Sequence, residues 1–117
     1  MMNLPISLDQ ITELLLNDAM RKKNENVDLI PVVKLIIPDS AVSVVLASID
    51  EELKELYGLF FMPNAQPKLA TMKIEDFIRL SEHLKKPILL EEGWEANATL
   101  EEYYQEALNT YQTQTIH

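Results

Sequence analysis

The side chains with the most distinctive chemistry gather near the C-terminal end of this sequence. Between Pro87 and His117 there are six acidic residues, one tryptophan and three tyrosines, and neither Lys nor Arg occurs there. Aromatic rings dominate the binding energy of many protein interfaces, and charge speeds the encounter of two proteins. The pattern predicts a protein-binding face with contacts at Glu91, Glu92, Trp94, Glu95, Glu101 and Glu102. A second interpretation stays open, in which the rings fill the core and the acids are only solvated.

A second candidate surface is the stretch from Phe61 to Pro67, which contains two prolines. Because proline restricts the chain, less conformational entropy is lost when Met62 or Asn64 contacts a partner. The alternative is an ordinary connection between two strands in which Phe61 is buried.

Patterns typical of catalysis are scarce. The histidines are His83, inside an expected helix, and His117 at the last position, and there is no cysteine. The motifs H-E-x-x-H and G-x-S-x-G are absent, and two glycines are too few for a phosphate-binding loop. Adjacent acids such as Glu51-Glu52 suit solvated turns and helix starts. We therefore expect no catalytic residue, no metal site and no cofactor.

The overall charge narrows the choice of partner. Ten Lys and Arg against nineteen Asp and Glu give a formal charge of −9. Binding to phosphates or to anionic lipid needs a basic patch instead. No apolar stretch reaches the roughly 18 residues of a membrane span, and the first residues lack the pattern of a secretory signal. We expect a protein partner, and neither nucleic acid nor a membrane.

Apolar residues at helical spacing predict three helices. Their ranges are 8–22, 74–86 and 100–112. Ser7 with Gln10, and Thr99 with Glu102, form capping boxes that set the start of the first and third helices. The second helix ends where two lysines precede Pro87.

Between the first two helices, β-branched and aromatic runs alternate with turn residues, which is typical of strands. Four strands are predicted at 32–37, 41–49, 56–62 and 69–74, with a short edge strand near 88–90. Both faces of the second strand are apolar, with Ile49 on the same face as Val45, so this strand is expected to be central. Short connections favour antiparallel pairing.

Together these elements predict an α+β fold in a single domain, residues 1–117, with an ordered core over about 7–112. A mostly antiparallel sheet of about four strands is packed by three helices in the order α-β-β-β-β-α-α. The side chains expected in the core are Val33, Leu35, Val45, Leu46, Leu59 and Phe77.

The order of several short motifs resembles a family of short bacterial proteins known only as a domain of unknown function and common on conjugative plasmids and integrative elements. The matching motifs are Pro31-Val32-Val33-Lys34-Leu35, Pro38-Asp39, Leu46 through Asp50, Tyr57-Gly58-Leu59 and Pro67-Lys68-Leu69. With a helix start at Ile74 and a final helix that contains tyrosines, the resemblance covers residues 8–112.

The chain departs from this family at three places. Ser43-Val44 stands where the family usually has a Thr-Trp pair, Ala47-Ser48 where it has Thr-Glu, and Lys68 where it has Glu. A ligand that the family held with that tryptophan or those glutamates is therefore not expected here.

Within the family, the chain is similar to a small inhibitor of paired ubiquitin-modifying bacterial effectors, a deamidase and a transglutaminase. This resemblance implies a metaeffector, a non-enzymatic protein that binds an effector enzyme and covers its substrate-binding surface. It also implies synthesis in the bacterial cytoplasm, and it leaves translocation into the host cytosol open.

Other classes of function stay open. One is an accessory protein of a mobile element, of antirestriction or nucleic-acid-mimic type, whose acids would have to be spaced like phosphates along one face. Lysines interrupt the acids in the first two thirds of the chain. Another is an enzyme, which needs a pocket with a perturbed titrating group. The apolar strands and an uncovered sheet edge would also allow a homo-oligomer.

Overall fold

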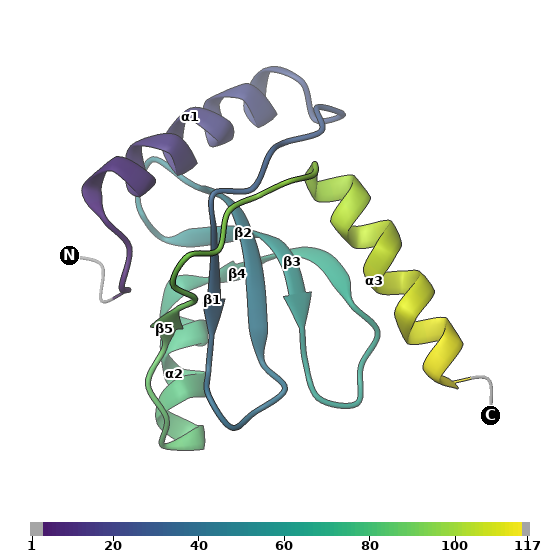
Figure 1. The fold of residues 1–117 in the computed structure, drawn as a ribbon. Coiled ribbons are helices and arrows are strands. Elements are labelled where there is room, and N and C mark those ends of the chain that lie inside the picture. Colours follow the sequence, from purple (N-terminus) through teal and green to yellow (C-terminus); the bar gives the residue numbers. More distant parts are fainter. Residues whose placement is uncertain (1–3, 116–117) are drawn as a thin grey trace.

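A five-stranded antiparallel sheet forms the centre of the computed structural model, which describes residues 4–115 (Figure 1). Its strands are β1 (Val33–Ile36), β2 (Ser43–Ile49), β3 (Glu55–Phe61), β4 (Lys68–Lys73) and β5 (Leu89–Leu90). Their spatial order is β4-β3-β2-β1-β5, so the four predicted strands form a meander and the predicted edge strand pairs with β1. The two ends of the predicted domain, 1–3 and 116–117, lie outside the described residues.

Three helices flank the sheet. They are α1 (Leu8–Lys23), α2 (Ile74–Leu84) and α3 (Leu100–Thr115). The predicted capping box begins α1: Ser7 Oγ accepts from the Gln10 N–H at 3.2 Å, and the Gln10 side chain accepts from the Ser7 N–H at 2.9 Å. α3 runs past its predicted end at residue 112, because no proline or glycine follows Tyr111 to stop it. The α+β class and the predicted order of elements are confirmed.

Each face of the sheet has a core of its own, because alternate side chains of a strand point to opposite faces. On the first face, Leu46 of β2 belongs to one cluster with Leu14 of α1 and Phe77 of α2. On the second face, Val45 belongs to another cluster with Leu100 of α3. The six predicted core side chains are all buried, none of them more than 4% exposed. No helix within residues 4–115 is long and apolar enough to cross a membrane.

One prediction about β2 is wrong. Strict alternation places Ile49 on the face of Val45, but Ile49 lies in the first core with Leu46. The reason is a β-bulge between Leu46 and Ser48, where the pairing with β3 shifts register. Ala47 is the extra residue, and one extra residue reverses which face the following side chains occupy.

The bulge also holds α1 in place. Asn17 of α1 donates a hydrogen bond from Nδ2 to the Ala47 carbonyl at 2.8 Å and to the Ile30 carbonyl at 3.0 Å. One amide therefore joins α1 to the bulge of β2 and to the segment that leads into β1.

Candidate protein-binding site

α3 covers only part of the second sheet face and leaves a groove beside it. The first turns of α3 pack Leu100, Tyr103 and Ala107 against this face, and Leu100 is 3% exposed. From Tyr103 to Tyr111, the helix borders a hollow of about 450 Å³ between itself and the sheet. We call this hollow the α3 groove. Its volume lies within the range of ligand-binding pockets, roughly 300–1,000 Å³.

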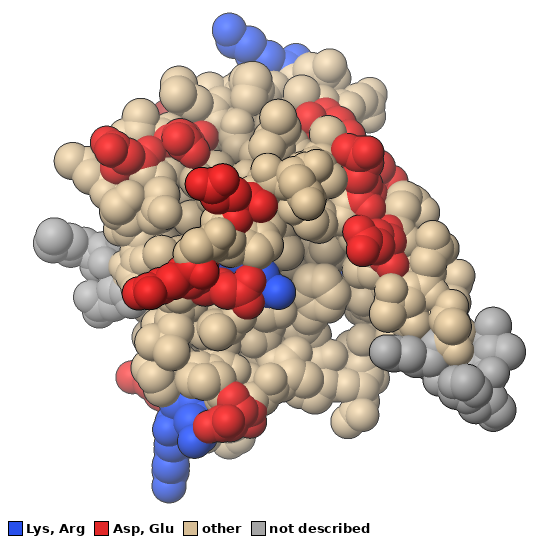
Figure 2. Space-filling view, in the orientation of Figure 1, with Lys and Arg blue, Asp and Glu red and all other residues tan. Residues whose placement is uncertain are grey.

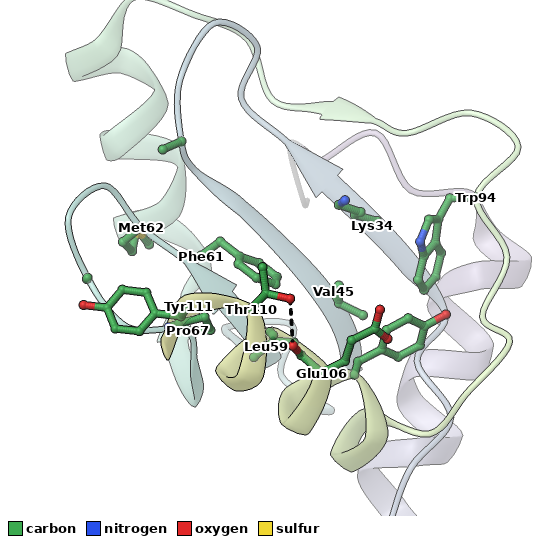
Figure 3. A pocket seen from close by; sticks show the side chains of 14 residues that line it. Lys34, Val45, Leu59, Phe61, Met62, Pro67, Trp94, Glu106, Thr110 and Tyr111 are labelled. Atoms are coloured by element: carbon green, nitrogen blue, oxygen red, sulfur yellow. Dashed lines mark hydrogen bonds between the residues drawn. The ribbon is translucent and has the colours of Figure 1, made fainter. Parts of the chain in front are cut away.

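The floor of the α3 groove is apolar. It consists of Val45 from β2 with Leu59 and Phe61 from β3. Met62 and Pro67, from the connection between β3 and β4, form the wall nearest the C-terminal end of α3 (Figure 3). The structure therefore brings Met62 into the same site as the C-terminal aromatic residues, and Phe61 is only partly buried.

Trp94 stands at the opposite end of the groove (Figure 3). Its ring centroid lies 5.9 Å from that of Tyr103, with the rings tilted by 39°. The Tyr103 hydroxyl donates to Asn97 Oδ1 at 2.8 Å and accepts from the Asn97 N–H at 3.0 Å. These contacts fix the segment 94–97 against α3. The sequence left open whether Trp94 fills the core or lies at a binding face. The ring is half-buried and does both in part, because it packs on Tyr103 and also lines the groove.

Replacing Trp94 with alanine is expected to lower the free energy of unfolding by about 1–3 kcal/mol. The variant loses the ring pair with Tyr103, which is worth about 0.5–1.5 kcal/mol, and also the apolar area that the half-buried ring covers. The ring is half-buried, so the loss should stay below the roughly 3–5 kcal/mol of a core tryptophan. Urea denaturation followed by circular dichroism measures it, because the variant has no other tryptophan for fluorescence. Trp94→Phe, which keeps a ring, is the control. A loss above 3 kcal/mol would mean that Trp94 belongs to the core.

Acidic side chains surround a second hollow of about 560 Å³, which we call the acidic hollow. Its carboxylates belong to Glu91, Glu92, Glu95 and Glu106. Trp94, Tyr103 and Glu106 line both hollows, so the acidic hollow adjoins the α3 groove. Lys34, which lines the groove, forms an ion pair with Glu91, with 3.7 Å between Nζ and Oε1. Figure 2 shows Asp and Glu spread over this face of the molecule, with few Lys or Arg among them.

Three predicted contacts do not line either hollow. Glu102 caps α3, because its Oε1 accepts from the Thr99 N–H at 2.9 Å. The Glu101 N–H donates to Asp28 Oδ1 at 3.0 Å, which ties the start of α3 to the segment before β1. Asn64 is exposed in the connection between β3 and β4, in the left-handed conformation with φ 57°. Glu101 and Glu102 therefore help to position α3, while Glu91, Glu92, Trp94, Glu95 and Met62 lie at the site.

The sequence interpretation missed several residues of the site. Glu106 and Thr110 share a helix face with Tyr103, at spacings of three and seven residues, and this periodicity was available in the sequence. No pattern in the sequence places Lys34 at this site. It reaches Glu91 only because the chain after β5 stays beside β1, where the Glu91 N–H donates to the Lys34 carbonyl at 3.0 Å.

The histidines lie away from this site. His83 is exposed in α2 and lines neither hollow. His117 lies outside the described residues. Among the residues that the structure describes, no group of three or more His, Asp or Glu is arranged to hold a metal ion.

Comparison with known proteins identifies the family. A family model described as a protein of unknown function (DUF2958) matches residues 6–113, which include every strand, α1, α2 and both hollows. No curated protein and no solved structure matches the chain. The match covers nearly the whole sequence, as the resemblance of its motifs implies. The chain therefore belongs to the DUF2958 family of proteins of unknown function.

Proposed function

We propose that this protein is a non-enzymatic regulator that binds another protein through the α3 groove and the acidic hollow. The observation that carries the proposal is an apolar floor, with Val45, Leu59 and Phe61, beside an aromatic ring and a rim of carboxylates. Protein interfaces have the same arrangement: an apolar and aromatic centre surrounded by a polar rim. Trp94 is the proposed anchor at the junction of the two parts.

The proposed partner is a ubiquitin-modifying bacterial effector, a deamidase or a transglutaminase. This part of the proposal rests on the resemblance of the sequence to a small Legionella metaeffector that inhibits such a pair. Bound over the substrate-binding surface of the effector, the protein would keep ubiquitin away from the catalytic centre. In this proposal the protein is made in the bacterial cytoplasm and reaches its target there or, after translocation, in the host cytosol.

A nucleic-acid mimic is the second candidate, and the spread of acids over one face favours it (Figure 2). A mimic of this kind presents carboxylates at the spacing of phosphates and needs no apolar groove. The α3 groove therefore favours the first candidate. The two candidates differ in a simple competition: DNA should displace a mimic from its target enzyme and should leave a bound effector in place.

Adding the purified protein to a ubiquitin deamidase or transglutaminase effector is expected to abolish ubiquitin modification, because a covered surface admits no substrate. The mass of ubiquitin reports deamidation, and gel electrophoresis reports cross-linking.

If acids steer the encounter, raising the salt concentration should slow association more than it speeds dissociation, since screening acts on the long-range field. Surface-plasmon resonance separates the two rates.

A matched pair of variants tests which acids act. Glu92→Lys with Glu95→Lys changes the rim, whereas Glu25→Lys with Glu82→Lys makes the same change of charge at exposed positions that line neither hollow. The first variant should associate more slowly than the second. Glu91 is left unchanged because it pairs with Lys34. Failure of the wild-type protein to bind either class of effector would rule out the proposed partner.

A further inference from the structure

We propose that the α3 groove and the acidic hollow together bind one short segment of the partner, in which a large apolar side chain stands next to a lysine or arginine. The apolar side chain enters the α3 groove, and the cationic group lies in the acidic hollow. This inference rests on the proposed protein-binding function and adds the chemistry of the segment that is recognised.

The α3 groove selects the apolar side chain. Its floor is formed by Val45, Leu59 and Phe61, and Met62 continues the apolar surface along one wall. Phe61 and Met62 are only partly buried, so they stay in contact with water while the groove is empty. A side chain that fills the groove removes this apolar surface from water, which favours binding.

The acidic hollow selects the cation. It brings together four carboxylates, and Lys34 is the one Lys or Arg among the residues that line the two hollows. Lys34 is already engaged, because its Nζ lies 3.7 Å from Glu91 Oε1. The ion pairs of the described residues include none that involves Glu92, Glu95 or Glu106. Three carboxylates are thus left to attract a positive charge from outside.

The contact between the two hollows requires the apolar and cationic groups to be close together. Trp94, Tyr103 and Glu106 line both spaces, so the two hollows lie on either side of the same three side chains. A cation that enters the acidic hollow also approaches the Trp94 ring, and tryptophan is the aromatic side chain that attracts cations most strongly. A lysine or arginine immediately beside the apolar residue satisfies all of these contacts at once.

Other occupants fit less well. A second copy of this chain carries the same formal charge of −9, so the two copies would repel each other. A nucleic acid would bring phosphates to a rim of carboxylates. A small apolar ligand would use the groove but not Glu92 and Glu95, which are exposed and face solvent. A basic segment of a protein uses both hollows.

Selection from a library of short random peptides, displayed on phage and exposed to the full-length protein, tests the proposal directly. We expect the enriched peptides to share a large apolar residue next to Lys or Arg. Synthetic copies of these peptides can be titrated by fluorescence, because Trp94 is the only tryptophan in the chain. Enriched peptides that lack a cation, or a selection that enriches no sequence, would overturn the proposal.

Two variants of α3 give a matched control. Thr110→Phe fills the groove, and Thr110 makes only a hydrogen bond to the Glu106 carbonyl, at 3.1 Å (Figure 3). The control is Asn109→Phe, which places the same ring at the position before Thr110 on α3. Asn109 is exposed and lines neither hollow. Threonine, asparagine and phenylalanine have similar helix propensities, so both variants should fold. We expect Thr110→Phe to weaken peptide binding about tenfold or more and Asn109→Phe to leave it within about twofold.

The same variants separate failure of this proposal from failure of the proposed function. If Thr110→Phe inhibits the effector as well as the wild-type protein does, the groove is not the binding site, although the inhibitory function stands. If the enriched peptides bind as expected but no effector is inhibited, the chemistry of the segment stands and the class of partner is wrong. Equal binding of the peptides to Thr110→Phe and Asn109→Phe would overturn the proposal.

Discussion

Replacing Leu46 with alanine is expected to lower the free energy of unfolding by about 2–5 kcal/mol, the cost of a large cavity in a packed core. Leu46 is fully buried in the first core, and β2 is paired with a strand on each side. The surrounding strands cannot close the cavity without breaking their own hydrogen bonds. Urea denaturation monitored by circular dichroism or by Trp94 fluorescence measures the loss.

Leu16→Ala is the matched control, because it makes the same chemical change at a position that is 61% exposed. This position lies in α1, where alanine is the best helix former, so the change in stability should stay within about 0.5 kcal/mol. A loss well below 1 kcal/mol for Leu46→Ala, or equal losses for the two variants, would contradict the position of Leu46 in the core.

Gly58→Ala is expected to lower the free energy of unfolding by about 1–3 kcal/mol, because the new methyl group has no room. A Cβ atom at Gly58 would meet the carbonyl oxygen of Val45 and the Cα of Leu46. Both atoms belong to the backbone of β2, beside the bulge, and cannot rotate away as a side chain can. We expect faster amide hydrogen exchange in β2 and β3, measured by NMR.

Gly93→Ala provides the contrast. Apart from Gly93 and its two chain neighbours, no described residue has an atom within 4 Å of a Cβ at this position, but Gly93 has φ 76°, a conformation that alanine adopts only at a cost. Any destabilisation there should come from the local backbone and should leave the exchange protection of β2 unchanged. Unchanged protection of β2 in Gly58→Ala as well would mean that the sheet accommodates the methyl group.

Local chemistry was sufficient to predict most of the fold. The start of α1 follows from a capping box, in which Ser7 and Gln10, three positions apart, satisfy each other's backbone N–H groups. The strands follow from β-branched runs between turns, and the predicted core follows from which faces of those runs are apolar. The predicted end of α3 is three residues too early, because the polar residues after Tyr111 prefer neither helix nor coil strongly.

Local sequence patterns do not predict which face of the sheet the side chains of β2 occupy after Ala47. From Ser43 to Ile49 its sequence is largely apolar on both faces, and nothing in these residue types marks a bulge. The bulge depends on the register of β3 and on the bond from Asn17 to the Ala47 carbonyl, which joins residues thirty positions apart. Long-range contacts of this kind can override a regular pattern.

The candidate site, like the fold, was determined partly by residue types and partly by tertiary packing. The residue types alone determined that an acidic, aromatic region lies near the C-terminal end and that Met62 lies in a proline-restricted connection, because charge, ring and proline are properties of single residues. Only the tertiary structure decided that Met62, Trp94 and Lys34 border one groove. It also decided that Glu102 caps a helix while Glu106 lines the site. The physical reason is that a groove exists only between elements, and the packing of α3 on the sheet sets which side chains face each other across it.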